Sequence, residues 1–316
     1  MLQNIKKRLL KIKIVRLLLI WSKKYSFVGF DGASIYFVAR FFFISIFEGD
    51  LSNRAASIAF NFFIAIFPGI IFIFSLIPMI PIESFQETLL FNIQQTLPKG
   101  VKEIGLETIS DLINTPRGGV LSVNFFLATY FATNGIYCLT DQFNNTYLFK
   151  EKRNFLHQRL IAFILVFIST ILLIIAILLT IISSEIINYA LEMEYIQDGF
   201  AIKLFEIGKF TVAFLLFYFV IAFIYYYGPS VKIRWKFFSA GTSLATVSLI
   251  LTSIAFGYYV SNLSNYNKIY GSLGTIMVVM LWLFINSLIL LIGFELNASI
   301  AKAHKEGRCI KGNTKK

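Results

Sequence analysis

Charged residues are scarce in this chain of 316 residues: they make up 15% of it, whereas hydrophobic residues make up 57%. A typical soluble domain is about 25% charged, so the composition excludes an ordinary water-soluble domain and predicts an integral membrane protein. The mean hydropathy of +0.73 agrees with this prediction. The apolar residues form long continuous runs that do not alternate with polar residues, which favours an all-α membrane protein over a transmembrane β-barrel.

Cysteine and histidine are almost absent, with two residues of each. Cys138 and Cys309 have neither the spacing of a metal knuckle nor that of a disulfide framework, and His157 and His304 lie far apart in the sequence. The chain also has no HExxH, GxSxG or P-loop motif. A hydrolytic nuclease needs clustered metal-binding carboxylates and histidines. We therefore predict no enzymatic activity, no cofactor and no metal site.

Hydropathy divides the chain into three parts. Residues 1–50 predict a basic amphipathic helix that would lie on an anionic lipid surface, followed by a short interfacial helix. Residues 51–301 predict a transmembrane domain, because its apolar runs reach the roughly 20 residues that a helix needs to cross the hydrocarbon core. Residues 302–316 predict a basic cytoplasmic tail. The sequence predicts six transmembrane helices, at about 54–80, 120–140, 160–183, 204–227, 237–260 and 271–300.

A long connection, 82–118, separates the first two predicted transmembrane helices. Its apolar residues recur at helical spacing and are accompanied by several glutamates. This pattern predicts an amphipathic helical loop at the outer surface of the membrane. Basic residues interrupt the first apolar stretch of the chain, at Lys11, Lys13 and Arg16, so we expect no cleavable signal peptide.

Lysine and arginine are unevenly distributed among the loops and account for the net charge of +12. About ten precede Ala55, about four lie in 144–159, three in 228–236 and six in the tail, whereas the alternate loops carry one to three each. Basic loops tend to remain on the cytoplasmic side, so the sequence predicts a plasma-membrane protein with both termini in the cytoplasm. On this interpretation the basic charge marks one membrane face and not a nucleic-acid groove.

Several polar side chains recur at helical spacing within the predicted spans. Arg54, Asn61 and Pro68 share one face of the first span, and Asn134 and Asp141 share one face of the second. Such a face either packs against other helices or lines a path, and both alternatives stay open. The last span carries a similar stripe of small and polar residues, formed by Thr275, Trp282, Asn286, Gly293 and Asn297.

Three ionisable residues are predicted to lie at one depth near the cytoplasmic side: Arg54, Asp141 and Glu295. Ionisable residues within a membrane are costly and are therefore candidates for function. One interpretation is a structural ion pair of Arg54 with Asp141 or Glu295. The other is a gate or a lipid headgroup site on the cytoplasmic side, in which Arg54 would contact a phosphate.

Four segments together resemble the YihY/BrkB family of bacterial inner-membrane proteins: RAASIAFNFFIAIFP, DQFNNTY, YGPSVKIRWKFFSAG and YGSLGTIMVVMLWLFINSLILLIGFELNA. The resemblance covers roughly 49–301 and implies six spans, the bacterial inner membrane and a role in handling envelope lipids. Members have carried the label ribonuclease BN, which the missing metal-binding constellation argues against for this chain. The residues that match the family motifs are Arg54, Ala55, Ala56, Pro68, Asp141, Asn144, Tyr147, Pro229, Tyr270, Gly271, Ser272, Gly274, Glu295, Leu296 and Asn297.

The sequence and the resemblance together predict a multi-pass protein that transports or handles envelope lipids or another amphiphile. The alternative is a membrane scaffold that recruits envelope-assembly proteins through the outer loop, 82–118. The expected partners are membrane lipids and, in the alternative, those proteins, but no nucleic acid; the oligomeric state stays open. The candidate functional or gating residues are Arg54, Asn61, Pro68, Asn134, Asp141, Asn144, Tyr270, Gly271, Ser272, Asn286, Glu295 and Asn297.

Overall fold

A computed structural model describes most of the chain as α-helices joined by turns, with no strand among the described residues. The predicted all-α class is therefore confirmed for this part of the chain. Residues 1–20 of the predicted amphipathic helix, nearly all of the outer loop 82–118, and Tyr270 and Gly271 lie outside the described residues. The described residues are 21–23, 25–27, 29–76, 118–149, 154–192, 199–230, 236–261 and 272–313.

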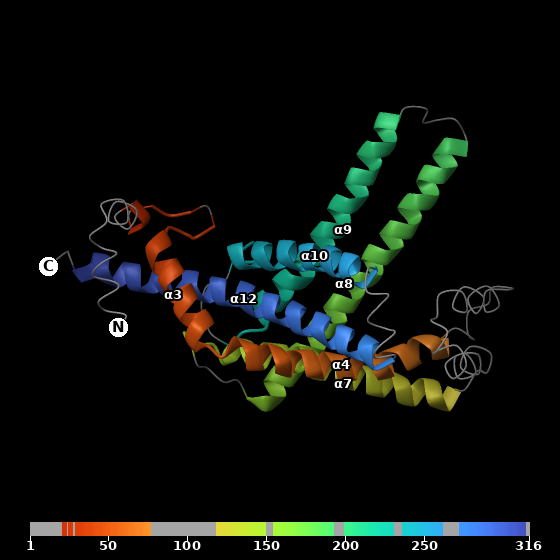
Figure 1. The fold of residues 1–316 in the computed structure, drawn as a ribbon, viewed down its shortest axis with the longest axis horizontal. Coiled ribbons are helices and arrows are strands. Elements are labelled where there is room, and N and C mark those ends of the chain that lie inside the picture. The colour runs from red at the N-terminus through yellow and green to blue at the C-terminus, as the bar shows by residue number, and fades with distance from the viewer. Residues whose placement is uncertain are drawn as a thin grey trace. The chain divides into compact units, whose positions relative to one another are not determined.

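The helices follow the apolar runs of the sequence (Figure 1). Each of the six predicted spans overlaps one of these helices, and a shorter helix precedes the first span. Ser34 caps that shorter helix, because its side chain accepts a hydrogen bond from the backbone N–H of Phe37. The helices are α3 (Ile35–Glu48), α4 (Leu51–Leu76), α7 (Gly118–Asn144), α8 (Phe155–Glu192), α9 (Gly199–Tyr227), α10 (Ala240–Ser261) and α12 (Ser272–Asn313).

Five helices among the described residues contain a stretch that is long and apolar enough to cross a membrane. Helix α7 has 27 residues but is not one of the five. Its apolar run is interrupted by polar side chains, among them Asn124, Thr133 and Asn134. The total of six spans therefore stays a prediction. The five stretches are Leu51–Phe72, Phe155–Ala176, Ile207–Tyr227, Ala240–Tyr259 and Ile276–Glu306.

The chain forms two compact units. The second unit comprises Ser52–Leu139 and Ile250–Leu288. Helices α7, α10 and α12 each contribute residues to both units, and α8 and α9 belong entirely to the first unit. The first unit comprises Met1–Leu51, Thr140–Leu249 and Ile289–Lys316.

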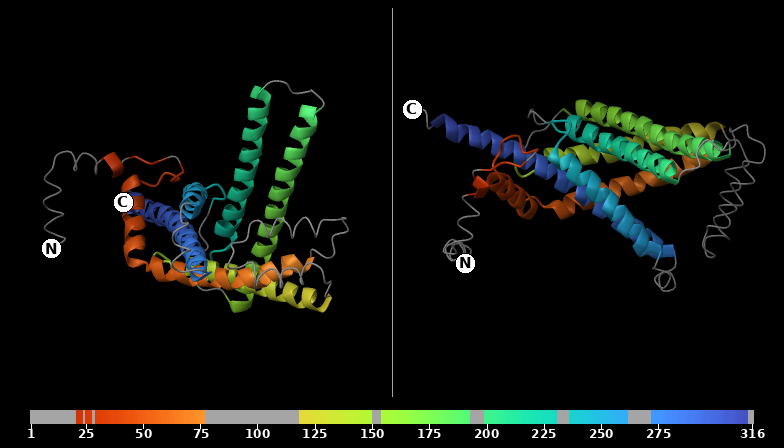
Figure 2. Two further views of the ribbon diagram at one scale, coloured as in Figure 1. Left: turned by 45° about the vertical axis from the view of Figure 1, so that its right-hand side comes forward. Right: turned by 90° about the horizontal axis from the view of Figure 1, so that it is seen from above.

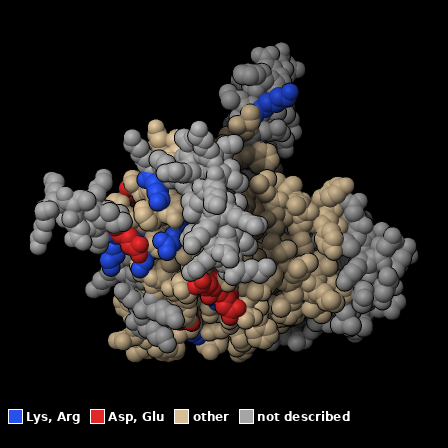
Figure 3. Space-filling view, turned by 60° about the vertical axis from the view of Figure 1, so that its left-hand side comes forward, with Lys and Arg blue, Asp and Glu red and all other residues tan. Residues whose placement is uncertain are grey.

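Helices α8 and α9 of the first unit run side by side in opposite directions (Figures 1 and 2). The apolar stretch of α8 is the least buried of the five, with 11% of it buried. Most of the described surface in Figure 3 is uncharged, with the acidic and basic side chains in small groups. A surface of this kind suits contact with lipid chains. The large exposed side chains of α8 include Phe163, Phe167, Ile171, Leu173, Ile174 and Leu178.

Helix α3 packs against the C-terminal part of α12 within the first unit. Val38 and Phe41 of α3 form a buried apolar cluster with Ile300 and Ala303 of α12, and Ala33 lies in the same cluster. Burying such side chains is worth roughly 1.5–3 kcal/mol each for the larger ones. This contact fixes the short α3 helix on α12 and positions its polar residues for the contacts described below.

Two glycines let α10 and α12 approach closely in the first unit. A Cβ at Gly241 would collide with the carbonyl oxygen of Gly293 and with the side chain of Asn297. A Cβ at Gly293 would lie 2.6 Å from the Tyr225 hydroxyl and 2.8 Å from Ala245. Small residues at a helix crossing are the common means of close packing in membrane proteins. The Tyr225 hydroxyl uses this space to donate a 2.6 Å hydrogen bond to the carbonyl of Leu290.

In the second unit, α4 and the first part of α7 lie against each other. A Cβ at Gly135 of α7 would lie 2.9 Å from the Phe62 ring of α4, and Phe72 contacts Phe125 with ring centroids 5.5 Å apart. Pro68 lies inside α4, which continues to Leu76. The close approach at Gly135 brings the polar faces of the two helices together.

Replacing Gly241 with alanine should destabilise the protein by about 1–3 kcal/mol, because the added methyl overpacks the α10–α12 crossing. The matched control is Gly257→Ala on the same helix, where an added Cβ meets nothing within 4 Å. That control should be neutral or stabilising by roughly 0.5–1 kcal/mol. The measurement is thermal unfolding of the detergent-solubilised protein. Equal midpoints for the two variants would contradict the close crossing.

Candidate functional site

Glu295 lies in the interior of the first unit, with none of its surface exposed. Its Oε2 accepts a hydrogen bond of 2.5 Å from the Ser45 hydroxyl of α3 and one of 2.6 Å from the Thr146 hydroxyl. Ser45 and Thr146 are themselves fully buried. A buried carboxyl group is tolerated only when protein groups satisfy it. Glu295 therefore ties together α12, α3 and the turn that follows α7.

The turn after α7 presents Thr146 to Glu295. Asn145 closes the end of α7, because its backbone N–H and its side chain both donate to the carbonyl oxygen of Asp141. The Asn145 side chain also donates to the Asp141 carboxylate, at 3.2 Å. The Thr146 hydroxyl in turn accepts from the backbone N–H of Leu148, at 3.4 Å. Asp141 is thus part of the turn that orients Thr146.

Asn144 joins the end of α7 to the segment that follows α9. Its side-chain oxygen accepts a 2.6 Å hydrogen bond from the backbone N–H of Ser230. Asn144 is 2% exposed, and its Nδ2 has no hydrogen-bond partner among the described residues. Pro229, next to Ser230, is buried as well. Asn144 therefore holds two connections of the first unit together.

Asn297 satisfies the N-terminus of α10 from a neighbouring helix. Its Oδ1 accepts from the backbone N–H of Gly241 at 2.8 Å, and its Nδ2 donates to the Ser239 hydroxyl at 2.8 Å. The Ser239 hydroxyl also accepts from the backbone N–H of Thr242, as an N-cap does. The first N–H groups of a helix lack partners within the helix. Asn297 supplies the missing acceptor for one of these groups, the N–H of Gly241, and so fixes α10 to α12.

The polar face predicted between the first two spans is assembled in the second unit. Nδ2 of Asn134 donates to Oδ1 of Asn61 at 2.6 Å, and Nδ2 of Asn61 donates to the backbone carbonyl of Ser57. One turn away, the Ser57 hydroxyl lies 3.4 Å from the Cys138 sulfur. The structure thus brings two predicted candidates, Asn61 and Asn134, into direct contact. Both amides take part in a hydrogen-bonded seam between α4 and α7.

The remaining described candidates are Arg54, Asn286 and Ser272, which all belong to the second unit. Arg54 is in the first turn of α4 and is 7% exposed. Arg54 belongs to the second unit, whereas Asp141 and Glu295 belong to the first. An ion pair of Arg54 with either acid therefore stays a prediction. Asn286 donates to the backbone carbonyl of Trp282 in its own helix, at 2.8 Å. Ser272 is the first residue of α12.

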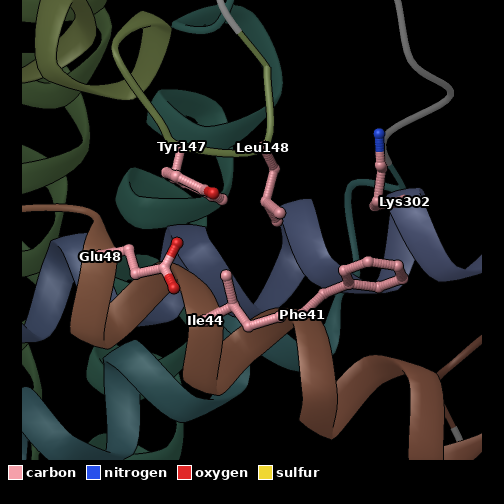
Figure 4. Close-up of a pocket in the computed structure, with 6 residues that line it drawn as sticks. All are labelled: Phe41, Ile44, Glu48, Tyr147, Leu148 and Lys302. Carbon is pink, nitrogen blue, oxygen red and sulfur yellow. The ribbon is translucent and has the colours of Figure 1, made fainter.

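A cavity of about 250 Å³ opens beside the Glu295 contacts in the first unit (Figure 4). We call it the α3 cavity. Its apolar walls come from α3 and from the turn after α7, and its polar groups come from α3, that turn and α12. Figure 4 shows Glu48 and Tyr147 at one end and Lys302 at the other. The lining residues are Phe41, Ile44, Glu48, Tyr147, Leu148 and Lys302.

Tyr147 and Lys302, two polar residues of the α3 cavity, already interact with neighbouring side chains. The Tyr147 phenol bonds to Glu48, and this hydrogen bond together with the negative charge of Glu48 raises the pKa of Tyr147 above its usual value of 10.0. The phenol therefore stays protonated at neutral pH and remains a donor. The Lys302 ammonium lies 3.9 Å from a carboxylate oxygen of Glu306 and 5.6 Å from the centroid of the Phe149 ring.

Sequence reasoning missed Ser45, the Thr146 contact and the α3 cavity. Ser45 is a polar residue within the largely apolar sequence of α3, IYFVARFFFISIFE. A polar side chain at such a position is the one sequence feature that indicates a buried polar contact. Its partner is 250 residues away in the sequence, so no local pattern could pair them. Among the described residues, no three His, Cys, Asp or Glu side chains come together as a metal site would need.

Removing the Ser45 hydroxyl should destabilise the protein by about 1.5–3 kcal/mol, because a buried carboxyl group loses a donor. The change is Ser45→Ala, and the control is Ser243→Ala, whose side chain is exposed and bonds only within its helix turn. The control should stay within about 0.5 kcal/mol of the parent. In a Glu295→Ala background the Ser45→Ala effect should shrink markedly, as a double-mutant cycle of unfolding free energies would measure. An undiminished effect would mean that Ser45 acts independently of Glu295.

Two kinds of comparison place these residues among known proteins. A family model described as Virulence factor BrkB matches residues 43–316. The ribonuclease-like protein YfkH of Bacillus subtilis is 28% identical over 253 residues, which cover 80% of this chain and 91% of YfkH. No solved structure matches this chain.

Shorter matches come from UPF0761 membrane proteins. The one from Tolumonas auensis is 32% identical over 74 residues, 23% of this chain and 24% of that relative. The one from Haemophilus influenzae strain 86-028NP is 33% identical over 89 residues, 28% of this chain and 33% of that relative. The matched segments thus span a quarter to a third of these two relatives. Because the family match extends from α3 to the end of the chain and includes Thr146 and Glu295, this protein belongs to the Virulence factor BrkB family of membrane proteins.

Proposed function

We propose that this protein binds and moves an amphiphilic lipid at the cytoplasmic side of the bacterial inner membrane. The observation that carries the proposal is the α3 cavity, which combines apolar walls with opposite charges at its two ends. A lipid is a ligand that presents apolar and charged groups close together, as this cavity does. The exposed apolar surface of α8 offers an environment for acyl chains.

The depth of the cavity supports a site at the membrane surface. Lys302 lies seven residues after Glu295 in the same helix, about 10 Å along its axis at a rise of 1.5 Å per residue. The stretch Ile276–Glu306 is longer than the roughly 20 residues that span the hydrocarbon core, so its basic end extends to the headgroup level. Tyr147, which lines the cavity, is half-exposed, and tyrosine is one of the aromatic residues enriched at the membrane interface. The distribution of basic residues predicts both termini in the cytoplasm, and we therefore propose that this level is the cytoplasmic surface.

The hydrogen bonds to Glu295 hold the residues next to the cavity in place. Ser45 and Thr146, which bond to Glu295, are next in sequence to Ile44 and Tyr147, which line the cavity. A movement of α3 away from α12 would therefore break the hydrogen bond from Ser45 to a buried carboxyl group. We propose that the Glu295 contacts hold the cavity in shape, and that they are not themselves the binding groups.

Purified protein in liposomes should move a labelled phospholipid between leaflets faster than empty liposomes do. Filling the cavity with Leu148→Trp should slow that movement at least severalfold, because the added ring occupies the binding volume. Leu156→Trp is the control, since Leu156 is 79% exposed and does not line the cavity. The measurement is the rate at which a membrane-impermeant quencher reaches the labelled lipid. The proposal fails if wild-type rates equal those of empty liposomes.

A scaffold that recruits envelope-assembly proteins is the alternative function. It draws on the amphipathic pattern predicted for 82–118, which lies almost wholly outside the described residues. A scaffold moves no lipid, so the liposome measurement separates the two functions. The α3 cavity favours lipid handling, because a docking surface for a protein partner does not need opposite charges inside a small cavity.

We also propose that the chain does not cleave RNA, although the name of the relative YfkH includes the term ribonuclease-like. The sequence supplies neither a nuclease motif nor a cluster of His and acidic residues. Incubation of the purified protein with tRNA and either Mg²⁺ or Zn²⁺ should give no cleavage above that of a mock purification. Cleavage that co-purifies with the protein and scales with its concentration would refute this proposal.

A further inference from the structure

We propose that the α3 cavity binds a zwitterion with a primary ammonium at one end and a phosphate at the other. The ammonium would lie against Glu48 and the phosphate against Lys302. This inference deepens the proposed lipid function, on which it rests where the zwitterion is the headgroup of a lipid. The same chemistry also occurs in free phosphoethanolamine, and the experiment below distinguishes the two sources.

The charges at the ends of the cavity favour a zwitterion over a simple ion. A ligand with only negative charge would be attracted by Lys302 but repelled by Glu48 in the same small cavity. A ligand with only positive charge would meet the opposite difficulty. A zwitterion satisfies both ends at once, and Figure 4 shows that the two charged groups come from opposite ends of the site. Such complementarity governs selectivity more than affinity.

Glu48 can accept an ammonium while it keeps its contact with Tyr147. An ionised carboxylate has about four lone-pair sites, and the Tyr147 side chain lies at the same end of the cavity as Glu48 (Figure 4). One phenol can occupy at most one of these sites, so acceptor positions remain for N–H donors. A primary ammonium has three such donors, whereas a quaternary ammonium has none. The site should therefore prefer an ethanolamine-type headgroup to a choline-type one.

Lys302 can exchange its present partner for a phosphate. Its contact with Glu306 is 3.9 Å long, and the side chains of both residues are about one third or more exposed. An exposed ion pair of this kind is worth about 0–1 kcal/mol. A phosphate offers three acceptor oxygens and a larger charge. The Glu306 contact therefore presents little barrier to binding a phosphate.

The small volume of the cavity suits a headgroup. Sites for drug-sized ligands occupy about 300–1,000 Å³, and the α3 cavity has about 250 Å³. Phe41, Ile44 and Leu148 form apolar walls between the charged ends, where the short carbon link between ammonium and phosphate would lie. The acyl chains of a lipid would remain outside, in the membrane.

The test measures the thermal stability of the detergent-solubilised full chain with three soluble probes at equal concentration and ionic strength. Phosphoethanolamine should raise the unfolding midpoint in proportion to its binding, whereas ethanolamine alone and inorganic phosphate alone should not. Either simple ion raising the midpoint as much as the zwitterion does would overturn the proposal. The comparison uses only wild-type protein, so it does not depend on any variant folding.

Variants then locate the binding groups. Glu48→Gln and Lys302→Gln should each weaken the apparent affinity for phosphoethanolamine about tenfold, because each removes a charged hydrogen-bonding partner. Lys305→Gln is the matched control, since Lys305 is exposed on the same helix and does not line the cavity. An equal loss in Lys305→Gln and Lys302→Gln would indicate general charge attraction and would overturn the assignment.

Liposomes with labelled lipids separate this inference from the proposed function. Faster movement of ethanolamine lipids than of choline or glycerol lipids, lost in Lys302→Gln, supports a headgroup site. Movement without headgroup preference and unaffected by Lys302→Gln refutes the site while the lipid function stands. Binding of phosphoethanolamine without any lipid movement refutes the lipid function and leaves a site for a free zwitterion.

Discussion

The structure depends on one constraint: polar groups buried in an apolar protein must find their partners inside it. A polar atom left unpaired in a membrane interior costs several kcal/mol. In the first unit, Glu295 meets this requirement with hydroxyls from α3 and from the turn after α7. In the second unit, the amides of Asn61 and Asn134 meet it with each other. These contacts join helices that are remote in sequence, so polar pairing contributes to the order of the bundle as well as to its stability.

Close helix approach is what lets these short polar side chains reach their partners. The Asn297 side chain bonds to the N-terminus of α10 because Gly241 leaves room for it. Gly293 leaves room for the Tyr225 hydroxyl in the same way. In the second unit, Gly135 accommodates Phe62 one residue after Asn134. Small residues and polar contacts therefore depend on each other: the glycines bring the backbones together, and the hydrogen bonds hold them at that distance.

The sequence could predict the helices because their signal is local. Runs of apolar residues and turn residues identified six stretches that each overlap a helix of the structure. The periodic positions of Asn61 and Asn134 placed them on polar faces, and the structure pairs them. The Glu295 contacts could not be predicted, because Ser45 is 250 residues away and its partner is set by tertiary packing. The α3 cavity was missed for the same reason, since α3, the turn after α7 and α12 meet only in the folded chain.

The distribution of hydrogen bonds also separates structural from available polar groups. Asn297 uses both its oxygen and its nitrogen on α10, and Asn61 uses both on its neighbours. A ligand that bound to Asn297 or Asn61 would have to break these hydrogen bonds. Its own hydrogen bonds would replace the lost ones without a net gain. Glu48 and Lys302 differ, because their contacts lie at a surface where water and ligands can exchange with them. In this fold the interior polar residues therefore maintain the architecture, and the charged residues at its edge are the ones that we propose bind a ligand.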